Sequence, residues 1–575
     1  MKKIFRYSLL LLLASACGPK DGLHTLQLLT TNDVHGRWFD STYVEKGTRS
    51  SLMAINYYVD SVRTVDGADN VILIDAGDCL QGDNASYYYN YIDTRPEHLF
   101  TRLVSYMKYD AITVGNHDVE TGHPVYDRVA RELKSHGIPF LGGNAIRNDN
   151  GKPYFPLYKV FKRAGLKVLV IGYTNANNPA WMDESLWSGM HFESLVPRVQ
   201  EDVDRLRTKT GAQVVIVSMH SATGEGDGKI LEAQALDLYQ TLKGVDFVVC
   251  SHDHRETLRN NPEICLINTG NRAKYLGHGV LKVNIKDGKV KSKEASCELI
   301  PIDKRKTDPE MRNAFRKDFE AVRVFSLEEI GALAVDLRTR DAYSGMCNYV
   351  SLIQTVMLKG SNAKIAFAAP LTYNSTIPSG VLIYNDLFTI YPFENQLYEI
   401  KLTGKEIKGY LEYSYSKWLA EPGSPTTLHI VERSDTRNNQ TGWSFVARPY
   451  NFDSAAGINY TVDITKPAGE RIEIISMADG SAFDPDAEYH VAVTSYRASG
   501  AGGLLTEGAG IPEPELEKRI VHRYPEIREI LYDFVKEYGL IDESAICNSS
   551  LYGEWKFIPE DLATEKISAD LKRMF

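Results

Sequence analysis

The sequence predicts an α/β protein with more than one domain, and three observations support that fold class. The chain has 575 residues, a length typical of two to four domains. From residue 24 to residue 302, apolar runs of strand length alternate with helix-like segments such as residues 125–136 and 197–209. Five of these runs pass directly into potential metal ligands. Because ligands of open α/β sheets gather beyond the carboxyl ends of strands, we expect these side chains to meet at one sheet edge.

The composition is that of a globular protein, and its net charge indicates which kinds of ligand the protein could bind. Hydrophobic residues make up 43% and charged residues 24% of the chain, which is ample for a buried core. The formal net charge of −10 argues against a protein that binds nucleic-acid polymers through bulk positive charge. Small phosphate-containing substrates are compatible with this charge, because bound metal ions dominate the local field of a site.

The N-terminal residues have the form of an export signal. Basic residues among the first six precede an apolar, small-residue run at 8–16, which is too short to span a bilayer. Residues 14–17, Ala-Ser-Ala-Cys, resemble a bacterial lipobox. That resemblance implies removal of residues 1–16 and lipidation of Cys17; ordinary signal-peptidase cleavage is the alternative. We therefore expect a protein of the bacterial cell envelope, periplasmic or at the cell surface, held to the membrane by the lipid on Cys17.

The rest of the chain is expected to form two domains, residues 24–302 and 336–545. Residues 303–335 begin with a highly charged segment of helical period, which predicts a solvated linker helix; a helix of the first domain is the alternative. Residues 546–575 are expected as a C-terminal tail. In the second domain we expect helices at 343–358, 405–418 and 512–539, and strands at 364–368, 397–402, 457–464, 471–477 and 489–494.

Taken together, the strand-end residues predict a centre for two divalent metal ions. They are Asp33, His35, Asp78, Asn116, His220, His252 and His254. A single Asp-x-His or His-x-His pair is weak evidence, but five strand ends in order are strong evidence for one site. Imidazole and carboxylate together suit Zn, Mn, Fe or Co. Two such ions about 3.5–4 Å apart activate a water and neutralise phosphoryl oxygens in phosphate-ester hydrolysis.

These ordered motifs resemble those of the calcineurin-like metallophosphoesterases, and within them the secreted 5'-nucleotidase family. That family includes UDP-sugar hydrolases and 2',3'-cyclic-nucleotide 2'-phosphodiesterases. The resemblance covers nearly the whole mature chain. It implies a four-layer α/β/β/α metallophosphoesterase domain followed by an α/β substrate-binding domain of the nucleotidase type. It also implies one metal held by Asp33, His35, Asp78 and His254, and a second held by Asp78, Asn116, His220 and His252, with Asp78 as the bridge.

The same resemblance assigns the catalytic groups. His117 matches the catalytic histidine of the family, which stabilises the transition state or protonates the leaving oxygen. Asp118 or Glu120 would orient its ring, although the family usually has an Asp where Glu120 stands. His254 occupies a position that is Gln in some relatives, a difference that would alter the metal preference.

Two segments of the second domain are expected to bind the base of a nucleotide, which needs a flat slot between aromatic rings. Residues 448–453, Arg-Pro-Tyr-Asn-Phe-Asp, and residues 495–503, Ser-Tyr-Arg-Ala-Ser-Gly-Ala-Gly-Gly, resemble the base-stacking loops of the family. Their form is similar to that of its cyclic-phosphodiesterase branch. Tyr450 and Tyr496 are the predicted sandwich, with Phe452 as the alternative to Tyr450.

One departure from the family bears on the position of the phosphate. The 5'-nucleotidases of the family carry a phosphate-binding Arg before the Ile-Pro turn, and Asn374 stands near that point here. The preceding Ala-Ala-Pro, residues 368–370, is similar to the cyclic-phosphodiesterase branch. Since a guanidinium fork matches a terminal phosphate, its absence argues against a 5'-nucleotidase. Arg448 or Arg497 could replace it; surface roles are the alternative for both.

The expected activity is hydrolysis of small nucleotides outside the cytoplasm, with 2',3'-cyclic-nucleotide 2'-phosphodiesterase/3'-nucleotidase activity favoured. A 5'-nucleotidase or UDP-sugar hydrolase that uses the same centre is the alternative. A non-catalytic nucleotide-binding lipoprotein is the remote alternative. The expected cofactors are two divalent metal ions, the expected partner is a small-molecule nucleotide, and the chain is expected to act as a monomer.

Overall fold

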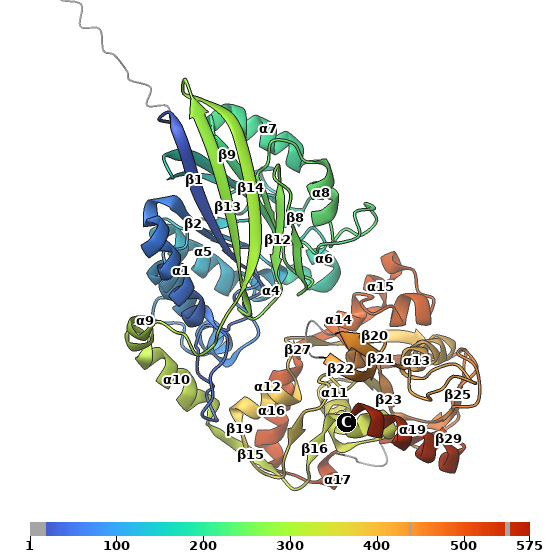
Figure 1. The fold of residues 1–575 in the computed structure, drawn as a ribbon. Coiled ribbons are helices and arrows are strands. Elements are labelled where there is room, and N and C mark those ends of the chain that lie inside the picture. The colour runs from blue at the N-terminus through green and yellow to red at the C-terminus, as the bar shows by residue number, and fades with distance from the viewer. Residues whose placement is uncertain (1–18, 436–439, 547–551) are drawn as a thin grey trace, which may run out of the picture.

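The first domain is a sandwich of two six-stranded sheets (Figure 1). The structure is a computed structural model that describes residues 19–435, 440–546 and 552–575, so the predicted signal peptide and Cys17 lie outside the described residues. One sheet has the order β14-β13-β1-β2-β3-β4 and the other β11-β12-β10-β9-β7-β6. The strands of the first sheet are β1 (Gly22–Thr31), β2 (Val71–Asp75), β3 (Ala111–Thr113), β4 (Phe140–Leu141), β13 (Tyr275–Lys286) and β14 (Lys289–Pro301). Those of the second are β6 (Tyr158–Arg163), β7 (Leu166–Tyr173), β9 (Val214–Met219), β10 (Phe247–Val249), β11 (Glu256–Arg259) and β12 (Cys265–Thr269).

The apolar pattern of the strands explains the four layers. Leu28 of β1 and Val168 of β7 pack between the two sheets. Their neighbours Leu29 and Leu169 point to the opposite faces and pack under helices, as the two-residue period of a strand requires. The prediction of an α/β/β/α sandwich is therefore confirmed. The covering helices are α1 (Leu52–Asp66), α3 (Leu99–Tyr106) and α5 (His123–Ser135) on the first sheet, and α7 (Val199–Thr210) and α8 (Ala235–Thr241) on the second.

The inner strands of both sheets are parallel. β1, β2, β3 and β4 run parallel in one sheet, and β7, β9, β10 and β12 in the other. Parallel strands bring their carboxyl ends to the same edge. In this protein that edge lies at the end of the sandwich that faces the second domain (Figure 1).

The second domain is built on a five-stranded sheet of order β23-β17-β26-β20-β27. Ala366 of β17 packs toward α11 and α16 on one face, and the next residue, Phe367, packs toward α13 on the other. The elements are α11 (Asn348–Lys359), β17 (Ile365–Ala368), β20 (Gln396–Thr403), α13 (Gly404–Trp418), β23 (Ser454–Ala456), β26 (Glu488–Thr494), β27 (Ile520–Glu526) and α16 (Ile527–Tyr538).

The helix predicted over residues 512–539 is wrong in its middle. The structure has a short helix α15 (Glu513–Arg519), then strand β27, and only then α16. The strand pairs antiparallel with β20, where Glu399 lies opposite His522. An edge of the sheet needs a partner strand, and that tertiary demand exceeds the weak helical preference of the segment.

The end of the chain is an integral part of the second domain. β29 (Trp555–Ile558) pairs in parallel with β24 (Ile458–Asp463), and α19 (Glu560–Met574) follows it. Trp555, Phe557 and Ile567 join the same hydrophobic core as α13. Residues 552–575, which the sequence predicted only as a tail, therefore complete this core.

The segment between the domains consists of α9 (Pro309–Ala314) and α10 (Arg316–Ser326). Met311 and Val322 are buried in the core of the first domain, so the segment is amphipathic and not solvated on all sides. At its end, the ring of Phe325 lies 4.2 Å from that of Tyr384 in the second domain. The segment thus packs on the first domain and contacts the second.

Candidate active site

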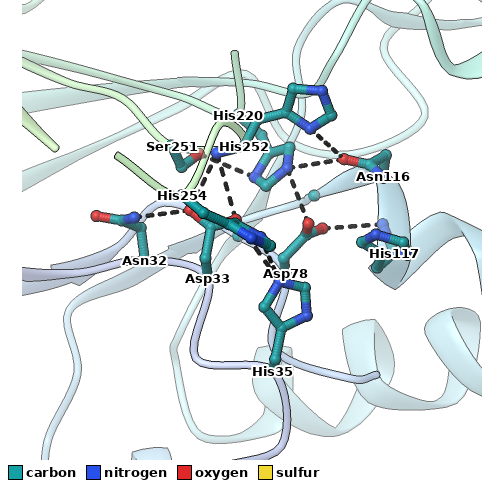
Figure 2. A network of polar contacts seen from close by, with 12 residues as sticks. Asn32, Asp33, His35, Asp78, Asn116, His117, His220, Ser251, His252 and His254 are labelled. Carbon is teal, nitrogen blue, oxygen red and sulfur yellow. Dashed lines mark hydrogen bonds and ion pairs between the residues drawn. The ribbon is translucent and has the colours of Figure 1, made fainter. Parts of the chain in front are cut away.

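The seven predicted metal ligands converge at the carboxyl ends of five strands (Figure 2). Their ligand atoms form two groups, each with all atoms within 4.8 Å of one another: Asp33, His35 and His254, and Asp78, His220 and His252. Asn116 joins the second group, because its Oδ1 lies 2.9 Å from both His220 Nε2 and His252 Nδ1. The structure therefore brings together all seven residues that the sequence proposed.

The spacing of the ligand atoms suits shared coordination spheres. The Nε2 atoms of His35 and His254 lie 2.8 Å apart, and His220 Nε2 lies 3.1 Å from Asp78 Oδ2. Two ligands at ~2.0–2.2 Å from one ion are separated by roughly 3 Å. In addition, Asp78 Oδ2 is buried and has no hydrogen-bond partner, which leaves it free to bind a cation. The residues present therefore fit divalent ions.

The backbone of the centre is held in an uncommon conformation. Asp33, His35, Asp78, His252 and His254 all have positive φ, between 47° and 79°. Residues with a Cβ rarely adopt this region, which costs roughly 1–2 kcal/mol each. The surrounding turns enforce it: the Asp33 N–H donates to the Gly77 carbonyl at 2.9 Å, and the His35 N–H to the Asp78 carbonyl at 3.0 Å. Strain of this kind is typical of sites whose side chains must point to one place.

Burial sets the charges of the first group. It lowers the pKa of His35 well below its ordinary range and that of His254 to about 4, so both rings are neutral, the form that binds metals. Burial also raises the pKa of Asp33 to about 8, although Asn32 donates a hydrogen bond to it at 2.7 Å. A bound cation would compensate this buried carboxylate.

Asp118 shapes the turn that carries Asp78. It is fully buried, and its carboxylate accepts the N–H groups of Gly115, Asp78, Cys79 and Leu80 at 2.8–3.0 Å. A Cβ on Gly115 would lie 2.1 Å from Asp78 Oδ1, so only glycine fits there. Asp118 is thus a scaffold residue and does not contact the ring of His117.

Glu120 is the partner of His117. His117 lies near the start of the short helix α4 (Asn116–Glu120), and Glu120 is its last residue. His117 Nδ1 lies 2.5 Å from Glu120 Oε2, and Gln81 donates to the same oxygen at 3.1 Å. Burial alone lowers the pKa of His117, but Asp78 and Glu120 raise it to about 10. These two carboxylates therefore favour the protonated form of the ring.

A cavity of about 300 Å³ joins this centre to the second domain. Tyr450 and Tyr496 both line it, and the ring of Phe393 lies edge-on to that of Tyr450 at 6.3 Å. Phe393 was missed by the sequence analysis; the available signal was an aromatic residue next to Pro392 between a helix and a strand. We call this space the nucleotide cavity. Its walls include His117, His254, Phe393, Tyr450, Tyr496 and Arg497.

Phe452 does not serve as the alternative to Tyr450. Its side chain is 0% exposed and stacks on Trp418, with ring centroids 5.6 Å apart, inside the core of the second domain. The Tyr-Asn-Phe run turns one aromatic side chain to the cavity and the other to the core.

Arg497 does not have the free guanidinium that phosphate binding requires. It is 4% exposed, which also excludes a surface role. Its donors reach both carboxylate oxygens of Asp453 at 2.9 and 3.0 Å, Asn451 Oδ1 at 3.0 Å, and the carbonyls of Ala501 and Tyr450. Arg497 therefore braces the loop that presents Tyr450. Arg448 is exposed and is not among the residues that line the cavity.

Comparison with known proteins agrees with this architecture. Residues 329–507 match the family model of the 5'-nucleotidase C-terminal domain, and residues 38–256 match that of the bacterial capsule synthesis protein PGA_cap. A 2',3'-cyclic-nucleotide 2'-phosphodiesterase/3'-nucleotidase of Haemophilus influenzae is 24% identical over 93% of this chain and 87% of its own length. The trifunctional nucleotide phosphoesterase YfkN of Bacillus subtilis is 23% identical over 92% of this chain. The matched region covers only 39% of the length of that protein. The structure of a Staphylococcus aureus protein assigned as a 5'-nucleotidase has a TM-score of 0.74 at 21% identity, over 93% of this chain and 99% of that one.

Proposed function

We propose that the chain, whose residues 329–507 match the 5'-nucleotidase C-terminal domain, is a metal-dependent hydrolase of 2',3'-cyclic nucleotides and 3'-nucleotides. One observation carries the proposal: His117 of the first domain and the tyrosines of the second line a single cavity. A nucleotide whose base lies between Tyr450 and Tyr496 would thus present its phosphate to the first domain.

The reaction divides between the metals and the chain's own residues. A bound pair of divalent ions would neutralise the phosphoryl oxygens and activate water. Tyr450 and Tyr496 hold the base, and His117 donates its proton to the leaving oxygen while Glu120 orients the ring. With a cyclic substrate, the bond to the 2'-oxygen is cleaved first. The 3'-monophosphate then binds again and loses its phosphate.

The charge of the nucleotide cavity supports the cyclic diester as the first substrate. Among the described residues that line it, Arg497 is the only arginine, and its donors are all used within the protein. Three carboxylates also line it: Asp453, which pairs with Arg497, and Glu120 and Glu394. A cyclic phosphodiester carries one negative charge, whereas a terminal monophosphate carries close to two. We therefore expect the cyclic diester to react faster than the monoester.

The test is product analysis with the full chain loaded with Mn²⁺ or Zn²⁺. Equal amounts of 2',3'-cyclic AMP, 3'-AMP, 5'-AMP and UDP-glucose are incubated with it, and products are separated by chromatography. We expect 2',3'-cyclic AMP to give 3'-AMP and then adenosine. Turnover confined to 5'-AMP or UDP-glucose would exclude this assignment and favour the 5'-nucleotidase alternative, while leaving the metal centre in place.

The location of the protein is a separate proposal, which rests on residues outside the described part of the chain. We propose that Cys17 is lipidated and holds the protein to an envelope membrane. Among the described residues, no helix is long and apolar enough to cross a membrane. The variant Cys17→Ser is expected to move the protein from the membrane fraction to the soluble fraction. If it stays with the membrane, the lipid anchor is not what holds it.

A further inference from the structure

A second cavity, of about 520 Å³, lies between the domains beside the nucleotide cavity. Glu120 and Glu394 line both cavities, so the two spaces share a wall next to His117. We call it the acidic cavity, because carboxylates and aromatic rings make up much of its lining. These residues are Tyr87, Tyr91, Trp181, Glu394, Glu526 and Glu529.

The acidic cavity has an excess of negative charge. Four carboxylates line it, those of Glu120, Glu394, Glu526 and Glu529, and the lining residues that the structure describes include no lysine or arginine. The nearest cation, Arg528, lies 3.3 Å from Glu526 and 3.7 Å from Glu394. His117 pairs with Glu120 and Arg528 lies beside Glu394 and Glu526, so two cations face four carboxylates and the cavity would favour a further cation.

Two of these carboxylates each have one oxygen without a hydrogen bond. Glu394 Oε1 and Glu526 Oε1 are buried and have no hydrogen-bond partner, and the side chain of Glu394 is 7% exposed. Arg528 uses its Nε and Nη2 on the carbonyls of Tyr391 and Phe393, at 3.1 and 2.8 Å. Arg528 lies within ion-pair distance of both oxygens but makes no hydrogen bond to either, so they keep the capacity to interact with a further cation.

The electrostatics agree with that geometry. Burial is the main cause that raises the pKa of Glu394 to about 8 and that of Glu526 to about 7. Repulsion from Glu526 and Glu120 adds to the pKa shift of Glu394, and repulsion from Glu120 and Glu529 adds to that of Glu526. Arg528 lowers both pKa values, and His117 lowers that of Glu394. A bound cation would lower both values.

The aromatic side chains select the kind of cation. Tyr87, Tyr91 and Trp181 come from the first domain and line the cavity together with the carboxylates of the second. Arg528 already lies over the Tyr87 ring at 5.8 Å, so this ring has the position of a cation-binding face. The ring of Trp181 also stacks on the metal ligand His252 at 4.9 Å, which places the cavity against the reaction centre. Aromatic faces attract organic ammonium groups, whereas a metal ion needs converging ligand atoms. Among the described residues, these carboxylates do not form a group of the kind found at the metal centre.

We propose that the acidic cavity is a second substrate subsite, which binds an ammonium group on the phosphate substituent that is not the nucleoside. The ligand class is a nucleotide phosphodiester that carries a quaternary ammonium or protonated amine. This inference rests on the proposed function, because the nucleoside must occupy the nucleotide cavity while the phosphate lies at the metal centre. Hydrolysis consumes one water and separates the ammonium alcohol from the nucleotide.

The test compares two esters that differ in one atom. Adenosine 3'-phosphocholine carries a trimethylammonium group, and adenosine 3'-(3,3-dimethylbutyl phosphate) carries the neutral tert-butyl group of the same shape. We expect kcat/KM to favour the choline ester by about tenfold or more in the metal-loaded full chain. In Glu526→Gln/Glu529→Gln that ratio should fall toward one, while 2',3'-cyclic AMP is hydrolysed as before. The matched control Glu513→Gln/Glu537→Gln changes the net charge equally at exposed positions and should keep the full ratio.

A binding measurement makes the inference independent of turnover. Tetramethylammonium is titrated into the protein and followed by saturation-transfer NMR, with Tyr91→Leu as a second variant on the aromatic side. Tyr91 is 41% exposed, so its replacement is tolerated by the fold. We expect binding in the wild type and weaker binding in both cavity variants. Equal kcat/KM for the two esters, or tetramethylammonium binding that the variants leave unchanged, would overturn the inference. Loss of 2',3'-cyclic AMP hydrolysis in the wild type would instead refute the proposed function.

Discussion

His117 is the residue on which the proposed chemistry depends most directly, and its contacts separate it from the metal ligands. Its Nδ1 is engaged by Glu120, and its backbone N–H donates to Asp78 Oδ1 at 2.8 Å. The side chain itself belongs to neither group of ligand atoms. The ring can therefore be removed while the ligand set stays complete.

We expect His117→Ala to lower kcat for 2',3'-cyclic AMP by about 10²–10⁴-fold, because the proton donor is lost. Metal content, measured by elemental mass spectrometry after dialysis, should be that of the wild type. The comparison variant Asp78→Asn should lose metal, since Asp78 is the proposed bridge. A His117→Ala protein without metal would show that the assigned role is wrong.

Substitutions of Tyr450 test whether the base of the nucleotide binds between Tyr450 and Tyr496. Tyr450→Ala should raise KM for 2',3'-cyclic AMP by about 5–100-fold, because stacking of a base on an aromatic ring is worth about 1–3 kcal/mol. Tyr450→Phe keeps the ring and should stay near the wild type. Ribose 2',3'-cyclic phosphate has no base, so its KM should be the same in all three proteins. A parallel rise for that substrate would mean that the mutation disturbs the loop and not the stacking.

At the scale of elements, the site depends on where strands end. Strands β1, β2, β3, β9 and β10 each deliver ligands in the first residues after the strand, and the parallel arrangement brings those residues to one edge. Residues at such positions are recognisable from apolar runs alone. The same runs do not show that β27 pairs with β20 or β29 with β24, because each pair joins segments more than 90 residues apart.

The C-terminal elements β29 and α19 should be essential for the second domain. Trp555→Ala removes a side chain that is 6% exposed and packs against the rings of Tyr415, Trp418 and Tyr460. We expect a loss of about 3–5 kcal/mol in the free energy of unfolding of this domain. Urea denaturation followed by tryptophan fluorescence measures it, with the exposed Lys556→Ala as control. Equal midpoints for the two variants would mean that the strand is dispensable.

At the scale of the whole molecule, the active site exists only because the two domains meet. Asn84 of the first domain donates to Asn385 of the second at 3.0 Å, and Arg523 pairs with Asp183 across the interface at 2.5 Å. Residues of both domains line the acidic cavity, so the charge of its carboxylates bears on how firmly the domains associate.

This arrangement predicts a dependence of stability on pH. The pKa of Glu526, about 7, exceeds its ordinary value, so the native state keeps a proton that the unfolded chain releases. The contribution of Glu526 to the free energy of unfolding is fully present below about pH 4.5 and is lost as the pH rises through 7. Glu526→Gln stays neutral throughout. Its melting temperature should be close to that of the wild type at pH 4 and exceed it by several degrees at pH 8. Calorimetry of both proteins at the two pH values measures this, and an equal difference at both would contradict it.

The sequence by itself determined the features that are local. The α/β layering followed from runs of apolar residues, and the seven candidate metal ligands followed from residue type and position after a strand. The four-layer sandwich was implied by the resemblance to the family. Tyr450 and Tyr496 were also indicated before the structure placed them in one cavity. Strand ends and ligand types are properties of a few consecutive residues, so no tertiary information was needed to propose them.

Only the tertiary structure decided the direction in which neighbouring side chains point and what they meet. It paired His117 with Glu120, sent Asp118 into the turn of Asp78 and Phe452 into the core, and satisfied Arg497 within its own loop. It also brought Glu394 and Glu526 of one domain beside Glu120 of the other. The physical reason is that hydrogen bonding, burial and charge at these positions depend on partners distant in sequence, which packing alone brings together.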